Sequence, residues 1–402
     1  PEATYVVERA VDLFAAEVGL DPAEVRRINL VPRFDEAHVT PAGATYDCGD
    51  FPEALARVLA AGGYEALRAE QAERRARSDR VALGIGLSTY VEVTAGPFAG
   101  GEYARVEVLP AADPAAGVDV AVYTGSSPHG QGLGTAFAMV ASAELGVPIE
   151  RVRVVHGDTD QVPRGVGTFG SRSLQLGGAA VREAAVEVVD RARRVAADLL
   201  EAAVDDVVLD VGAGAFHVAG SPAAARSWAD VAAAPDADLR AEHDFTAAQP
   251  TFPFGAHLAV VEVDTETGLA RLVRLVAVDD AGRVLNPLLA DGQRHGGLAQ
   301  GAAQALFEEV RYDADGNPLT TTFADYAFPS AAELPSFELI EMATPTWVNP
   351  LGAKGIGESG TIGSTPAVHN AVCDALAHLG VRHVDMPCTP ERIWRAIAAA
   401  GG

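Results

Sequence analysis

Apolar residues recur at helical spacing through the first part of the chain. Residues 3–18 carry Val6, Ala10, Leu13 and Val18 at this spacing and close at Gly19, and residues 22–29 form a second short segment. Residues 51–76 continue the helical pattern and end in a run rich in Arg and Glu, typical of a solvated surface. We therefore expect residues 1–80 to be mainly helical and to end at a domain boundary.

From residue 81 onward the pattern changes to that of strands interleaved with helices. Residues 81–93, 103–109, 118–123 and 152–155 alternate or run apolar over strand lengths. Residues 135–145, closed by Gly146, and the Ala-rich residues 175–203 have helical spacing, the latter weakened early by Gly177 and Gly178. This order predicts an α+β fold with mixed sheets over residues 81–402.

The second half repeats part of this order from about residue 254. Residues 104–108 lead to a loop with Gly, Gln and His at 129–132, and residues 259–263 lead to a similar loop at 292–297; each loop precedes a helix. Self-similarity of this kind indicates an internal duplication, with halves of about 81–250 and 251–402, although one matching pair at a long period can also arise by chance.

The overall charge and the cysteines exclude several classes of protein. With 30 basic and 55 acidic residues the chain has a net charge of −25, which argues against a nucleic-acid surface. Cys48, Cys373 and Cys388 are scattered, so no Cys-x-x-Cys pair suggests a disulfide framework, a structural zinc or an iron-sulfur cluster. No stretch approaches the length of a membrane span, and we expect a cytoplasmic protein without metal-ligating side chains.

A glycine-rich loop, residues 126–134, lies after a strand and before a helix, where free N–H groups favour an anion. It matches neither a dinucleotide fingerprint nor a P-loop, and a mobile glycine turn explains it equally well. A second loop, residues 165–173, also opens a helix. Because a cation at a helix N-terminus is unfavourable, Arg172 there favours a bound phosphate or carboxylate over a surface arginine.

Two further polar segments read better as turns. His156, Asp158 and Asp160 lie within five residues, but Asp and Gly at this spacing form Asx turns routinely. Asp280 and Asn286 follow a strand and could hydrogen-bond a ligand, or could simply stabilise their own turn. The residues alone favour the turn in both segments.

The loop over residues 349–360 sets Lys354 and Glu358 four residues apart among many glycines. A loop that only connects two elements seldom surrounds two charges with so many glycines, which favours a functional role over a solvated salt bridge. Residues 364–366 then read as an N-cap, a hydroxyl and a first-turn proline, so a helix is predicted to begin at Ser364 and end at Gly380.

Together these motifs resemble the molybdenum-binding large subunit of the xanthine oxidase family, in particular the aerobic carbon monoxide dehydrogenase type. The resemblance covers the whole chain, but only the C-terminal half of such a subunit. The family's order and spacing are matched by residues 129–132, 157–160, 167–173, 292–301 and 352–358.

The resemblance implies a fold, a cofactor and residue roles. Residues 1–80 would be a remnant of the first cofactor-binding domain and residues 81–402 the second. The cofactor would be molybdopterin cytosine dinucleotide carrying molybdenum, and Glu358 the active-site carboxylate. The implied cofactor contacts are Gly130, Gln131, Gly132, Ser171, Arg172, Ser173, Lys354, Gly355 and Gly357, with Asp280 and Asn286 in a weaker part of the pattern.

The implied activity is hydroxylation with water as the oxygen source and Glu358 as general base. The substrate, whether CO, an aldehyde, a purine or another heterocycle, stays open. Partners implied by the resemblance are the N-terminal half of the large subunit, an iron-sulfur subunit and a flavin subunit with FAD, in a dimer of heteromers, with association to the inner membrane face left open. Without that N-terminal half we expect no activity; the alternative is a non-catalytic cofactor-binding or assembly subunit.

Overall fold

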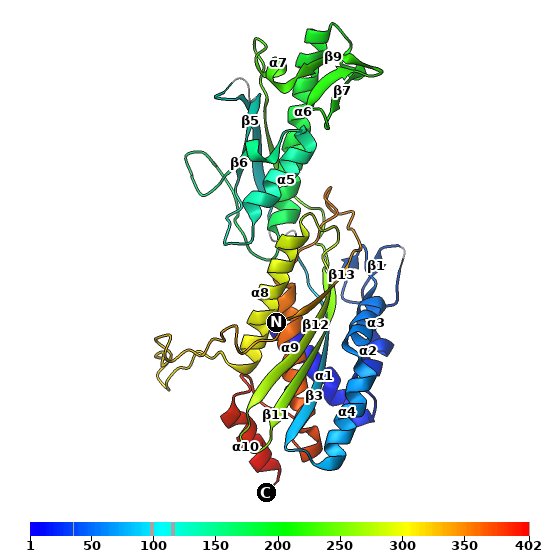
Figure 1. Cartoon of the computed structure of the whole chain (residues 1–402), viewed down its shortest axis with the longest axis vertical. Coiled ribbons are helices and arrows are strands. Elements are labelled where there is room, and N and C mark those ends of the chain that lie inside the picture. The colour runs from blue at the N-terminus through cyan, green and yellow to red at the C-terminus, as the bar shows by residue number, and fades with distance from the viewer. Residues whose placement is uncertain (35, 97–99, 114–116, 402) are drawn as a thin grey trace. The chain divides into compact units, whose positions relative to one another are not determined.

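The computed structural model describes residues 1–34, 36–96, 100–113 and 117–401 and divides them into two compact units (Figure 1). Unit 1 comprises residues 1–92, 252–345 and 356–402, and unit 2 comprises residues 93–251 and 346–355. The chain thus leaves unit 1 after β3 and returns to it before β11. The charged glycine loop of the sequence falls on a boundary, with Lys354 in unit 2 and Glu358 in unit 1.

The helices and strands of unit 1 are α1 (Glu2–Val18), α2 (Pro22–Asn29), β1 (His38–Val39), β2 (Thr45–Tyr46), α3 (Phe51–Gly62), α4 (Tyr64–Arg77), β3 (Val81–Val91), β11 (Phe254–Asp264), β12 (Ala270–Asp280), α8 (Pro287–Leu306), β13 (Glu338–Met342), α9 (Ser359–Leu376), the 3-10 turn η6 (Ala377–Leu379) and α10 (Pro390–Ala400).

Those of unit 2 are β4 (Glu102–Pro110), β5 (Val118–Thr124), α5 (Leu133–Leu145), the 3-10 turn η3 (Ile149–Arg151), β6 (Val152–Val155), the π-helical turn η4 (Ser173–Gly178), α6 (Ala179–Leu200), the 3-10 turn η5 (Val204–Asp206), β7 (Val207–Asp210), β8 (Ala215–Val218), β9 (Ser221–Ser227), α7 (Trp228–Ala232) and β10 (Arg240–Phe245).

The main sheet of unit 1 has the order β13-β12-β11-β3 and is covered on both faces. Leu83, Ile85 and Leu87 of β3 pack with α3 on one face, while Ala259, Val261 and the apolar side of α9 form the core of the other. A strand buried on both faces needs apolar residues at successive positions, which explains the near-continuous apolar runs of β3 and β11.

Helix α9 lies unusually close to its neighbours because small residues line the contacts. A Cβ on Gly86 of β3 would lie 2.0 Å from the carbonyl oxygen of Ala367, and one on Gly301 of α8 would lie 2.0 Å from Oγ of Ser364. Backbones can approach this closely only where side chains are absent. These glycines therefore fix the position of α9, the helix that follows Glu358.

The main sheet of unit 2 has the order β10-β4-β5-β6. Helix α6 packs on β4 and β10, and α5 packs on β6 and α6. The sheet of β7, β8 and β9 is joined to this layer through Trp228, whose indole N–H donates to the carbonyl of Leu145 at 2.7 Å. The apolar contacts of α6 are mostly alanines, as the predicted Ala-rich helix requires.

The two main sheets repeat one topology. In each, an antiparallel hairpin (β4–β5, β11–β12) is followed by a helix, by a strand parallel to the second hairpin strand, and by a second helix. The outer strand antiparallel to the first hairpin strand is β10 in one sheet and β3 in the other. This agreement supports the predicted internal duplication, and the α+β fold class is confirmed.

Several element boundaries differ from the sequence-based expectation. The predicted helix over residues 51–76 is broken at Gly63, which has φ 66 and caps α3. The helix predicted to begin at Ser364 begins at Ser359, with Pro366 inside it. Ser364 is no cap because its hydroxyl donates to the carbonyl of Leu298 on α8, 3.3 Å away. Burial of the whole helix outweighs the hydrogen bond that Pro366 removes.

The helices of the described residues carry no candidate for a membrane span, since none is both long and apolar enough.

Candidate functional site

Glycine-rich segments gather at one edge of the sheet in unit 2. The segment 124–134 begins with the last residue of β5, at the carboxyl end of that strand, whereas residues 156–164 separate the parallel strand β6 from the segment 165–173. The two segments touch: a Cβ on Gly125 would lie 2.3 Å from Cα of Gly165, and the N–H of Ser127 donates to Oγ1 of Thr168 at 3.1 Å. Two of the predicted cofactor loops are therefore neighbours.

A third segment of unit 2, residues 346–355, joins them. A Cβ on Gly355 would lie 2.5 Å from Cβ of Ser171 and 2.8 Å from its carbonyl oxygen, so the backbones of these two predicted contacts pack directly together. Asn349 shapes the segment: its amide donates to the carbonyl of Ala353 at 2.7 Å, and its oxygen accepts from the N–H of Leu351. Lys354 is 2% exposed, so the loop holds its ammonium inside the protein.

The loop with Gly130, Gln131 and Gly132 presents backbone rather than side chains. Gly130 and Gly132 have φ 103 and 81, values that residues other than glycine rarely adopt. Gly132 is the N-cap residue of α5, and among the described residues no side chain caps this N-terminus. The first N–H groups of α5 are thus available to an acceptor, which an anionic ligand could supply.

The second loop is organised by a buried ion pair. Arg172 is fully buried and its guanidinium donates to Oε2 of Glu102 at 2.6 Å, as well as to the carbonyls of Gly167 and Gly101. Glu102 is thus the anion that the sequence argument assigned to a ligand. The reasoning failed because the partner lies 70 residues away, on the first residue of β4.

Ser171 and Ser173 flank this pair. Ser171 has φ 49, a left-handed conformation uncommon outside glycine, and its carbonyl accepts from the amide of Gln175 at 2.9 Å. Ser173 is buried, and its hydroxyl lies 2.9 Å from that of Thr168. Non-glycine residues in such conformations cluster at ligand sites when the surrounding structure holds them.

In unit 1, Glu358 occupies the N-cap position of α9 and is exposed, as is Gly357. The next residue is anchored: Ser359 is completely buried, and its hydroxyl donates to Oε2 of Glu92 at 3.2 Å. Glu358 is thus an accessible carboxylate on a rigid support, as a general base requires.

Asp280 and Asn286 hold turns of unit 1. Asp280 is buried and accepts hydrogen bonds from the N–H of Gly282 and from the N–H and hydroxyl of Thr344, at 2.8–2.9 Å. Asn286 caps α8 by accepting from the N–H of Leu289 at 3.1 Å. The interpretation as turn residues accounts for these contacts. The segment with Asp158 is likewise a turn, in which Oδ1 accepts from the N–H of Asp160.

The sequence did not predict the buried network of charged residues around Asp279 of β12. Asp279 accepts from Tyr90 at 2.7 Å and from Arg294 at 2.8 Å, and lies 2.8 Å from Nε2 of His257. Burial alone would raise the pKa of Asp279, but His257, Arg294 and Tyr90 hold that pKa well below its usual range. The sequence signal that could have revealed this network is a His and an Arg inside otherwise apolar segments.

Comparison with known proteins identifies the class. A profile of the molybdopterin cofactor-binding domain matches residues 57–335. The carbon monoxide dehydrogenase large chain of Hydrogenophaga pseudoflava is 39% identical over 98% of this chain and 51% of its own length. The chain thus spans about half the length of the curated relatives it matches.

Solved structures agree. Carbon monoxide dehydrogenase from Oligotropha carboxidovorans aligns with TM-score 0.91 and 34% identity over the whole of this chain and 51% of its own. Quinoline 2-oxidoreductase from Pseudomonas putida 86 aligns with TM-score 0.89 and 35% identity, over 98% of this chain and 52% of its own.

The chain therefore belongs to the molybdopterin cofactor-binding domain family. It corresponds to part of a large subunit of the xanthine oxidase family and is similar to the carbon monoxide dehydrogenase large chain, as its motifs predicted.

The residues of unit 2 fit a bound pterin with phosphate groups. Gly130, Gly167 and Gly170 have positive φ, and the place that a Cβ would take on each is open, with no atom within 4 Å. Glycines packed against the protein, such as Gly355, do not leave such space. Open glycines beside an uncapped helix N-terminus let a planar ring and a phosphate approach the backbone.

Proposed function

We propose that this chain binds molybdopterin cytosine dinucleotide and supplies Glu358 as the base of a molybdenum hydroxylase. The observation that carries the proposal is the convergence of the segments 124–134, 165–173 and 346–355 in unit 2. These segments hold most of the residues that the family resemblance assigns to the cofactor.

The proposed contacts follow from what each residue offers. Gly130, Gly132 and the uncapped N–H groups of α5 would bind a phosphate, with the amide of Gln131 beside them. Ser171 and Ser173 would donate hydroxyls to the dinucleotide. Arg172, whose guanidinium is paired with Glu102, would contribute by holding the loop and through its backbone.

Lys354 offers an ammonium and Gly355 and Gly357 offer backbone N–H groups, which suit the polar edge of the pterin. Asp280 and Asn286 are proposed to act indirectly, by fixing the end of β12 and the start of α8. We propose none of these residues as a metal ligand, because the pterin itself would hold the molybdenum.

The chemistry that a bound molybdenum cofactor would supply is two-electron oxidation of the substrate with an oxygen atom derived from water. Glu358 would accept a proton from the reacting water at its carboxylate. For carbon monoxide, which has no C–H bond, the carboxylate would orient the reactants. Names of relatives suggest CO or a heterocycle such as quinoline as substrate; an aldehyde fits the same chemistry.

Electron transfer requires partners. We propose that an iron-sulfur subunit and a flavin subunit, together with the other half of the large subunit, complete a cytoplasmic complex, because the cysteines of this chain are too scattered to hold a cluster. The alternative is a cofactor-carrying or assembly subunit without turnover. The exposed Glu358 favours catalysis, since cofactor storage needs no general base.

Glu358→Gln in the complex co-expressed with its neighbouring genes tests the proposal. Turnover should fall by about 100- to 10,000-fold, the usual contribution of a general base. Molybdenum content and the CMP released by acid hydrolysis should stay unchanged, because Gln keeps the size and polarity of the side chain. Glu266→Gln, which neutralises an exposed carboxylate elsewhere in unit 1, is the matched control.

The outcomes separate the parts of the proposal. Unchanged turnover of Glu358→Gln would remove the base assignment. A wild-type complex with neither molybdenum nor CMP would remove the cofactor assignment. A complex that holds both but oxidises none of the candidate substrates would favour the carrier function.

A further inference from the structure

A cluster of soft and borderline metal-binding side chains lies at the C-terminal end of α9, within unit 1. His369 and Cys373 are four residues apart on α9, which places them on one face of the helix. After the turn η6 the chain reverses at Gly380, with φ 86, and brings His383 back beside them. None of these residues belongs to the proposed cofactor contacts.

The distances suit a shared ion. Ligand atoms of His369, Cys373 and His383 all lie within 4.8 Å of one another, and Sγ of Cys373 is 3.7 Å from Nε2 of His369. Around a tetrahedral zinc, ligand atoms are separated by about 3.3 to 3.8 Å, as metal–ligand lengths of about 2.0 to 2.3 Å require. The His383 side chain is 39% exposed, so it can move inward to close the set.

The ring of His369 has one nitrogen beside a carbonyl oxygen and one without a partner among the described residues. It is completely buried, and its Nε2 lies 2.7 Å from the carbonyl oxygen of Val384. Its Nδ1 is buried without a hydrogen-bond partner among the described residues. Nε2 is also the ring nitrogen that lies 3.7 Å from Sγ of Cys373, so an ion bound at Nε2 would replace its contact with the Val384 carbonyl. An orphaned buried nitrogen has no evident structural purpose here.

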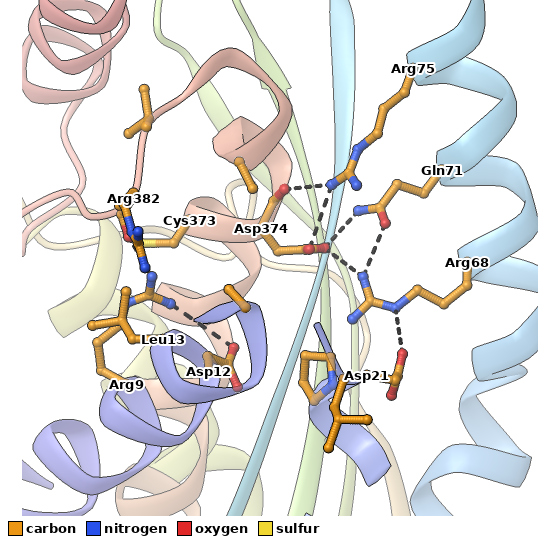
Figure 2. A pocket seen from close by; sticks show the side chains of 15 residues that line it. Arg9, Asp12, Leu13, Asp21, Arg68, Gln71, Arg75, Cys373, Asp374 and Arg382 are labelled. Carbon is orange, nitrogen blue, oxygen red and sulfur yellow. Dashed lines mark hydrogen bonds and ion pairs between the residues drawn. The ribbon is translucent and has the colours of Figure 1, made fainter. Parts of the chain in front are cut away.

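A cavity of about 520 Å³ in unit 1 lies next to the cluster, and Cys373 lines it together with Arg9, Asp12, Asp374 and Arg382 (Figure 2). Arg9 is held by Asp12 and by the carbonyl of Arg382, and Arg75 by Asp374. The arginines of the wall therefore have partners of their own. Asp385, whose carboxylate is 3.4 Å from Nε2 of His383, adds a negative charge next to that histidine.

We propose that His369, Cys373 and His383 bind one Zn²⁺ ion, with water or the Asp385 carboxylate as fourth ligand. Two imidazoles and one thiolate form a set that zinc accepts. Binding converts the Cys373 thiol to a thiolate and releases its proton to solvent. The thiolate and the Asp385 carboxylate offset the charge of the ion beside Arg9. Such an ion would tie α9 to the segment that leads into α10.

The site is tested on the intact complex by metal analysis, which does not depend on turnover or on the molybdenum cofactor. After incubation with Zn²⁺ and gel filtration, the wild type should retain one zinc per chain. The exposed His383→Ala should weaken zinc binding at least about 10-fold and Cys373→Ser at least about 100-fold. Molybdenum content should be equal in all three, which separates this site from the proposed function.

Cobalt substitution gives a spectroscopic signature that a structural role alone would not produce. Co²⁺ bound by the wild type should show a thiolate-to-cobalt charge-transfer band that is absent in Cys373→Ser. Cys48→Ser and His378→Ala, which change a thiol and an imidazole outside the cluster, should keep both the band and the zinc. Wild type that retains no zinc and shows no such band overturns the proposal, as does a band that persists in Cys373→Ser.

Discussion

The two repeated sheets place opposite charges at the same position of one topology. In each repeat, the parallel outer strand is followed by a loop and a second helical segment, and the residue immediately before that segment is Arg172 in unit 2 and Glu358 in unit 1. Arg172 is completely buried against Glu102, whereas Glu358 is exposed. One helix start is thus closed by a buried ion pair, and the other presents its carboxylate at the surface.

The difference that the structure describes is one of burial. In the first repeat Glu102, on β4, neutralises Arg172 inside the protein. In the second repeat the buried ion pair joins Asp279 of β12 to Arg294 of α8, and Glu358 at the start of α9 is exposed. A duplicated topology therefore determines where loops gather, while burial decides which of the two side chains reaches the surface.

The largest effect on stability is expected when the ion pair of Arg172 and Glu102 in the first repeat is broken. Arg172→Met should destabilise unit 2 by about 3 to 5 kcal/mol, because it leaves the Glu102 carboxylate buried without a partner. Glu358→Gln should change stability by less than about 0.5 kcal/mol, as for an exposed side chain. Urea unfolding of both variants, followed by a probe in each unit, measures the contrast.

The double variant Glu102→Leu, Arg172→Met sharpens this test. Replacing both charges by apolar groups removes the uncompensated ion, so much of the lost stability should return. Equal destabilisation by Arg172→Met and Glu358→Gln would contradict the division between a structural and an exposed helix start.

An intermediate effect is expected at the glycine contact of the second repeat. Gly301→Ala should destabilise unit 1 by about 1 to 3 kcal/mol, because the new Cβ would meet Oγ of Ser364 and the backbone nitrogen of Thr365. Gly296→Ala, on the same helix but facing open space, should instead stabilise by about 0.5 to 1 kcal/mol. Thermal unfolding of the pair reports the sign; a loss of stability in both would show that the contact is not what matters.

Features that depend on neighbouring residues were predictable from the sequence. The limits of α2 and the Gly146 cap of α5 follow from local signals, and both are observed. The glycine loops were recognised because strand, loop and helix succeed one another in the chain. The topology of the repeats followed from the same local order.

Features that depend on residues far apart in the chain were not predictable from the sequence. The partner of Arg172 is 70 residues away, and no local pattern points to Glu102. Pro366 suggested a helix start because in most helices an interior proline is too costly, but packing of α9 on β3 and α8 overrides this preference. The spacing of His369 and Cys373 was visible, yet His383 completes the cluster only through the turn after α9.

The smallest effect concerns the first helix of each repeat. Asn286 caps α8 with its side chain, whereas Gly132 leaves the N-terminus of α5 uncapped, within the part of the chain that the structure describes. Asn286→Ala should therefore lower the stability of unit 1 by about 1 kcal/mol, since the N–H of Leu289 loses its acceptor.

Gly132→Asn should weaken cofactor retention instead, because a side-chain cap would compete with a phosphate for the same N–H groups. Residue 132 has φ 81, a conformation that Asn adopts more readily than other residues with a side chain. Denaturant unfolding of the first variant and CMP content of the second test the contrast. If Gly132→Asn retained full CMP while Asn286→Ala lost it, the helix start that serves the cofactor would be that of α8.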